Sequence, residues 1–72
     1  MQNFTSNATD IEDIAQVLLA LPDEITGNKA NITFTDAEVN NVTGGLALAE
    51  FQLARFGFST QQSQKSVVFT NE

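Results

Sequence analysis

The chain has 72 residues, with nine Asp or Glu against three Lys or Arg for a formal net charge of −6, and no Cys or His. A chain this short forms one small domain at most, and it has no disulfide, no Cys- or His-based metal site and no nucleophile paired with an imidazole. We therefore predict no enzyme activity, no cofactor and no bound metal. The excess of acidic residues disfavours nucleic-acid binding. The sequence has no apolar run of about 18 residues, so no membrane span is predicted.

The N-terminal part of the chain predicts a tail followed by a helix. Residues 1–8 are polar and lack a period, which predicts a flexible tail. Thr9 and Glu12 have the spacing of a capping box, and Pro22 is a helix stop, so we predict an amphipathic helix over residues 10–21. The apolar positions that recur at helical spacing in this segment are Ile11, Ile14, Val17, Leu18 and Leu21.

The middle of the chain predicts a linker, a strand and a short helix. Residues 22–30 are rich in turn formers, and residues 31–35 alternate polar and apolar side chains like a short strand. A helix is predicted over residues 36–43. Gly44 and Gly45 are expected to interrupt it, because each Gly costs about 1 kcal/mol in a helix interior.

The C-terminal part combines a helical segment with β-prone residues. Residues 46–56 contain good helix formers, although partial alternation leaves a strand open. The tail beyond is flexible or β-prone, and residues 66–71 have the low charge and β-propensity of a steric-zipper segment. The alternative for that segment is a short strand in an uncleaved domain, paired with residues 32–35. Taken together, these patterns predict a small, mainly α fold.

Residues 34–45 carry the most informative motif, Phe-Thr-Asp-Ala-Glu-Val-Asn-Asn-Val-Thr-Gly-Gly. This run resembles the end of double-glycine leader peptides, which place a large apolar residue, Ser, Glu and two further apolar residues at set distances before the glycine pair. The family includes bacteriocins, peptide pheromones, modified-peptide precursors and small secreted biofilm proteins of cyanobacteria. The matching positions are Phe34, Thr35 in place of Ser, Glu38, Val39, Val42, Gly44 and Gly45.

The resemblance implies a division of the chain at Gly45. Residues 1–45 would be a leader for export and processing, recognised by the papain-like cysteine-peptidase domain of an ABC exporter and cut after Gly45. Residues 46–72 would be the mature peptide, secreted outside the cell, while the precursor is cytoplasmic. The charge divides at the same point, since residues 1–45 hold seven acids and one base and residues 46–72 hold two of each.

The expected function is that of a secreted peptide precursor. The mature peptide is neutral, so it lacks the positive charge by which pore-forming peptides are attracted to anionic membranes. We therefore favour an extracellular matrix or biofilm peptide that self-assembles into amyloid-like fibres, or a signalling peptide. The first alternative is an intact small acidic binding protein or inhibitor acting in the cytoplasm. A weaker alternative is a helix-turn-helix around residues 53–59, which has few cations for DNA. The motif itself also has an ordinary structural interpretation, as a capping box followed by a helix stop.

Overall fold

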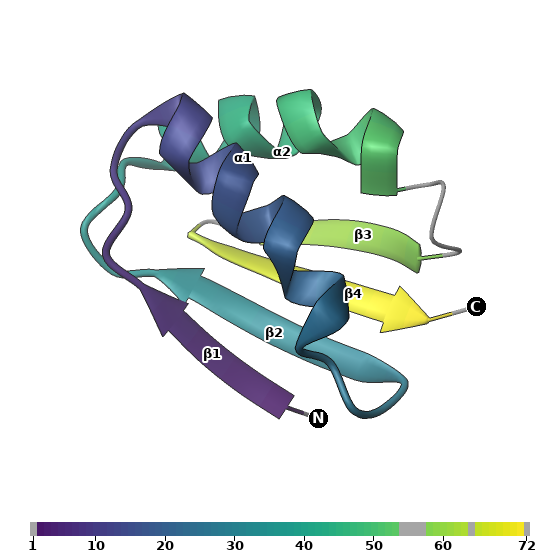
Figure 1. Cartoon of the computed structure of the whole chain (residues 1–72). Coiled ribbons are helices and arrows are strands. Elements are labelled where there is room, and N and C mark those ends of the chain that lie inside the picture. Colours follow the sequence, from purple (N-terminus) through teal and green to yellow (C-terminus); the bar gives the residue numbers. More distant parts are fainter. Residues whose placement is uncertain (1, 54–57, 64, 72) are drawn as a thin grey trace.

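A computed structural model describes residues 2–53, 58–63 and 65–71 of the chain. It forms two layers, with two α-helices covering one face of a four-stranded sheet (Figure 1). The strand order in the sheet is β1-β2-β4-β3. The elements in chain order are β1 (Gln2–Ser6), α1 (Ile11–Ala20), the 3₁₀ turn η1 (Leu21–Asp23), β2 (Lys29–Phe34), α2 (Val39–Leu53), β3 (Phe58–Ser63) and β4 (Ser66–Asn71).

The sheet is mixed, and the pairing joins the two ends of the chain. Strands β1 and β2 are parallel and are connected by α1, whereas β4 lies antiparallel between β2 and β3. Ile32 of β2 stands beside Phe4 of β1 on one side and Val67 of β4 on the other. The C-terminal segment therefore pairs with residues 29–33. The sequence left pairing with residues 32–35 as an alternative, so the strand pairing is found but its register begins three residues earlier.

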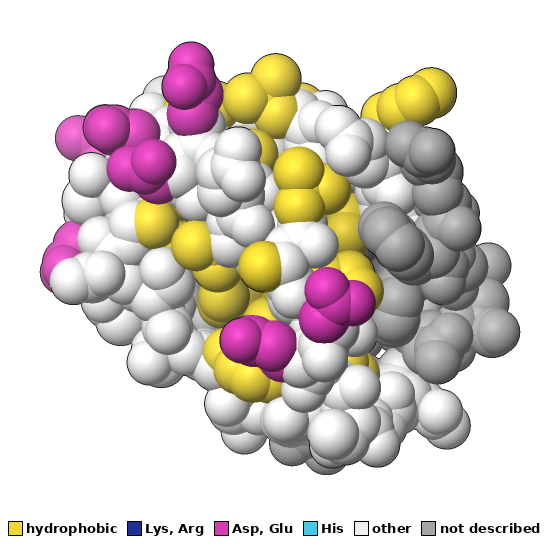
Figure 2. Space-filling view, viewed as in Figure 1, with side chains coloured by type: hydrophobic (Ala, Val, Ile, Leu, Met, Phe, Trp, Pro, Cys, Tyr) yellow, Lys and Arg dark blue, Asp and Glu magenta, His cyan; other side chains and the backbone are white. Residues whose placement is uncertain are grey.

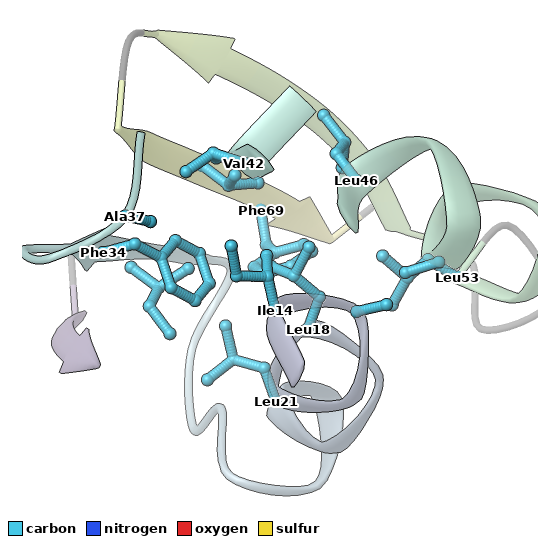
Figure 3. Close-up of a cluster of buried hydrophobic side chains, with 13 residues drawn as sticks. Ile14, Leu18, Leu21, Phe34, Ala37, Val42, Leu46, Leu53 and Phe69 are labelled. Carbon is cyan, nitrogen blue, oxygen red and sulfur yellow. The ribbon is translucent and has the colours of Figure 1, made fainter. Parts of the chain in front are cut away.

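The core lies between the sheet and the helices and is built from alternate residues of the central strands. In β2, Ala30, Ile32 and Phe34 are buried under the helices, while Asn31 and Thr33 lie half-buried on the uncovered face. This alternation is the period of two that places successive side chains on opposite faces of a strand. The core side chains that converge in Figure 3 include Ile14, Leu18, Leu21, Phe34, Val42, Leu53 and Phe69.

The prediction of a mainly α fold is wrong, because strands form at both ends of the described chain. The segment predicted as a flexible tail contains β1, whose one large apolar residue, Phe4, packs against the core. Residues 66–71, predicted as part of a flexible or β-prone tail, form the central strand β4. Strand β1 is stabilised by pairing with β2, and β4 by pairing with β2 as well as with its sequence neighbour β3. The pairings with β2 join segments distant in sequence, which no local pattern encodes.

The helix prediction near the N-terminus is close to the structure, and the later ones need correction. Helix α1 runs from Ile11 to Ala20 within the predicted range 10–21, and β2 starts two residues before the predicted strand 31–35. The predicted helices 36–43 and 46–56 form one continuous helix, α2, which begins at Val39, so residues 36–38 are not helical. Residues 54–56 lie outside the described part. The expected interruption at the glycine pair is wrong.

Gly44 and Gly45 lie inside α2 because α1 packs closely against them. A Cβ added at Gly45 would stand 2.5 Å from Cγ2 and 2.8 Å from Cβ of Ile14, and 3.1 Å from the carbonyl oxygen of Ile11. A Cβ at Gly44 would stand 2.9 Å from Cδ1 of Ile11. The absence of side chains at both positions lets the helix backbones approach, and the packing gained offsets the low helix propensity of glycine.

The two glycines should respond differently to substitution by alanine. Gly45→Ala should lower the free energy of unfolding by about 1–3 kcal/mol, because the added methyl meets Cβ of fully buried Ile14 and overpacks the helix interface. Gly44→Ala should change stability by less than about 1 kcal/mol, because the exposed end of Ile11 can rotate away and alanine favours the helix. Urea unfolding followed by circular dichroism measures both variants, and equal destabilisation would contradict the described helix packing.

Candidate functional site

The apolar residues of the leader motif divide between the core and the surface. Phe34 at the end of β2 and Val42 in α2 are fully buried, and both belong to the hydrophobic core. Val39 at the start of α2 is 44% exposed. The fold therefore does not bring these three side chains to one surface where a peptidase groove could contact them together.

The polar residues of the motif hold the loop before α2. The backbone N–H of Thr35 donates to the carbonyl of Ser6 at 3.0 Å, and its hydroxyl donates to the same oxygen at 3.4 Å. The carbonyl of Glu38 accepts the first N–H groups of the helix, from Asn41 at 3.0 Å and Val42 at 3.1 Å. Thr35 thus ties the loop to β1 rather than capping α2, which begins at Val39.

The predicted cleavage point lies in the middle of α2, and Gly45 is buried. A cysteine peptidase needs an extended chain at its nucleophile, so cleavage after Gly45 requires that α2 first unfold. The segments on both sides of this point share one sheet, because β2 from residues 1–45 pairs with β4 from residues 46–72. The division into leader and mature peptide stays a prediction that depends on this opening.

The described surface exposes large hydrophobic side chains on the helices. Such residues occur in α1 and α2: Ile11, Val39, Leu48 and Phe51. Phe51 is 82% exposed and Leu48 55% exposed. Figure 2 shows apolar side chains gathered over and between the two helices. An exposed aromatic beside an exposed leucine on one helix is a feature of binding surfaces more than of a solvated helix face.

Three of these residues lie on neighbouring turns of the two helices, and we call them the apolar strip: Ile11, Leu48 and Phe51. Leu48 and Phe51 are three residues apart, so they are neighbours on the outer face of α2. Gly44 lies one turn before Leu48 and contacts Ile11 of α1, which extends the strip across the helix pair. The opposite face of α2, with Val42 among its residues, is buried against the sheet.

The charges around the apolar strip are all negative in the helical layer. Helix α1, η1 and α2 contain no Lys or Arg, and their charged residues are Glu12, Asp13, Asp23 and Glu50. Figure 2 shows acidic side chains near the start of α1 and none of Lys or Arg on the described part of this face. Described Lys side chains occur at Lys29, which begins β2, and at Lys65, which precedes β4. The described charges of the helices therefore favour cationic groups.

An acidic hollow adjoins the apolar strip at Ile11. It has a volume of about 480 Å³ and is lined by Asp10, Ile11, Glu12, Asp13 and Asn41. The amide Nδ2 of Asn41 donates to the carbonyl of Thr9 at 2.9 Å, which fixes α2 against the start of α1. Asp10 is the residue before α1, but its carboxylate makes no capping hydrogen bond. The helix dipole at the start of α1 interacts favourably with these carboxylates.

A second hollow lies beside the start of β1 and has a volume of about 450 Å³. It is lined by Gln2, Thr26, Gly27, Asn28 and Lys29. Oε1 of Gln2 accepts the backbone N–H of Thr26 at 3.0 Å, so this side chain attaches the loop before β2 to the edge strand. The hollow has one charge and an otherwise neutral polar lining, and the hydrogen bonds show a structural role for Gln2.

The described residues contain no group of three or more His, Cys, Asp or Glu side chains placed to hold a metal ion. Within the same residues, no helix is both long enough and apolar enough to span a membrane. No protein-family model matches the sequence, and comparison with curated proteins and with solved structures gives no match.

The sequence does not predict the apolar strip, because helical periodicity alone does not show which face of each helix the rest of the fold covers. The signal that could have found it is in residues 46–53, where Leu48 and Phe51 lie on the face of the helix opposite to Leu46 and Leu53. A helix with apolar residues on two opposite faces is either buried on both or has one face left for a partner.

Proposed function

We propose that the intact chain is a small acidic binding protein that contacts a partner protein through the outer face of its helices. The observation that carries this proposal is the exposure of Phe51 and Leu48 on a helix whose opposite face is already buried in the core. Exposed apolar side chains of this size gain free energy only when a partner covers them, at roughly 25 cal/mol per Å² of apolar area removed from water.

The composition of the interior supports binding rather than chemistry. Every buried side chain of the described residues is hydrophobic, and no buried polar or charged side chain is found there. Catalysis needs titratable groups held in a desolvated cleft, where burial and neighbouring charges adjust their pKa values. The described carboxylates instead lie exposed on the surface, where they contribute charge.

Site-specific photocrosslinking in the producing cell tests the proposal. A benzophenone amino acid at position 51 should crosslink the full-length chain to a discrete partner protein. The matched control carries the same group at position 5, where Thr5 is exposed on the edge strand β1, and it should not give that product. Equal crosslinking from both positions, or none from position 51, would refute binding through the helices.

The double-glycine precursor remains a second proposal, and the register of Glu38, Val42 and the glycine pair favours it. In this case, an exporter peptidase would act on a chain whose α2 had not yet folded or had opened. Intact-mass spectrometry of cells and medium distinguishes the two proposals. A fragment that begins at Leu46 in the medium, lost when the exporter is deleted, would favour the precursor, whereas uncut chain bound to a partner favours the binding protein.

A further inference from the structure

We propose that the partner presents a cationic amphipathic helix, whose apolar side chains cover Leu48 and Phe51 and whose Lys or Arg side chain enters the acidic hollow beside Ile11. This inference rests on the proposed binding function and specifies its ligand. It combines the two neighbouring surfaces described above, the apolar strip and the acidic hollow, into one site. Neither surface by itself would select this class of ligand.

The apolar half of the site suits a helical ligand. Leu48 and Phe51 are one turn apart on α2, so they present a short row of apolar groups along the helix. An amphipathic helix laid against such a row offers apolar side chains at intervals of three and four residues. Phe51 is 82% exposed, so a ligand that covers it removes a large apolar area from water.

The charge of the helical layer selects the sign of the ligand. Because α1, η1 and α2 contain no Lys or Arg, every charged side chain of these elements that a ligand over the strip meets is a carboxylate. A second copy of this chain would bring the same acidic face against itself, which costs energy through like-charge repulsion. An anionic membrane surface is repelled for the same reason. A cationic protein segment satisfies both the apolar and the electrostatic requirements.

Ile11 connects the two halves of the site. It contacts Gly44 next to the apolar strip, and it also lines the hollow together with Asp10, Glu12 and Asp13. A ligand helix over the strip therefore passes the hollow at the start of α1. A Lys or Arg from its first or last turn can then hydrogen-bond these carboxylates, which have no basic neighbour in α1 or α2.

A designed peptide provides the probe. It has about 18 residues, or about five helical turns, with Leu on one face, Lys on the other and a single Trp. The protein has no Trp or Tyr, so Trp fluorescence follows the peptide alone. The full chain should bind this peptide more tightly than a scrambled peptide of equal composition. It should not bind a peptide in which Glu replaces every Lys.

Variants of the full chain locate the binding. The double variant Leu48→Ser with Phe51→Ser should weaken binding about tenfold or more. Val39→Ser removes an exposed apolar side chain outside the strip and should leave binding unchanged. Replacing Asp10, Glu12 and Asp13 by their amides should weaken binding and reduce its dependence on salt concentration. Circular dichroism confirms that each variant is folded.

Four outcomes overturn the inference. These are equal binding of the scrambled peptide, binding that persists in the double variant, a homodimer in sedimentation that the double variant abolishes, and binding to phosphatidylserine vesicles in place of the peptide. Failure of the proposed function is recognised separately. If position 51 crosslinks to a partner protein in cells but the cationic peptide does not bind, only the assignment of the ligand is wrong.

Discussion

Replacing Phe34 by Ala should lower the free energy of unfolding by about 3–5 kcal/mol, whereas Phe51→Ala should leave it nearly unchanged. Both substitutions remove the same atoms from a Phe side chain. Phe34 is fully buried at the end of the central strand β2, where its ring packs among residues of both helices and of the sheet (Figure 3). Phe51 is 82% exposed on α2.

The magnitude follows from the cavity that the first substitution leaves. Truncating a buried Phe to Ala costs about 3–5 kcal/mol, because transfer free energy is lost and the surrounding side chains relax only in part. A domain of this size has a total stability of about 4–10 kcal/mol, so the loss removes a large part of it. The exposed Phe51 loses little on truncation, since the folded and unfolded chains hydrate its ring similarly.

Equilibrium unfolding in urea, monitored by far-ultraviolet circular dichroism, measures both variants. Phe69→Ala provides a second test of the core, because Phe69 is buried on β4 and should behave like Phe34→Ala. If Phe51→Ala destabilised the chain as much as Phe34→Ala, the assignment of Phe51 to an open surface would be wrong. Phe51 would then not belong to a binding face.

A chain that ends at Gly45 should lack a cooperative fold. The truncation removes β4, which lies between β2 and β3 in the sheet, together with the second half of α2. The core then loses Leu46, Ala49, Leu53, Val67 and Phe69. The remaining β1, α1 and β2 cannot bury enough apolar surface to offset the conformational entropy of folding.

Amide proton dispersion in a nitrogen–proton correlation spectrum tests this expectation. The full chain should give dispersed resonances, and the chain of residues 1–45 should give resonances confined to the range of unfolded peptides. A dispersed spectrum and a cooperative thermal transition for residues 1–45 would contradict the single shared core. That outcome would favour residues 1–45 as an independent leader unit.

The sequence by itself determined the elements whose signals are local. The period of α1 is set by Ile11, Ile14 and Leu18, and Pro22 ends that helix, so its bounds agree with the prediction to within a residue. The alternation of residues 31–35 predicted most of β2 in the same way. In both cases the amphipathic pattern is the cause of burial, and neighbours further along the chain only complete it.

Tertiary structure alone decided the rest, because the deciding contacts join residues far apart in sequence. Strand β1 has one large apolar residue and forms by pairing with β2, and β4 becomes a central strand by pairing with both β2 and β3. Gly44 and Gly45 have low helix propensity, yet the close approach of Ile11 and Ile14 favours the helix there. The same packing turns one side of α2 to the core and leaves Phe51 on the surface, since a helix with apolar residues on opposite faces acquires an inside only when the sheet and α1 cover one of them.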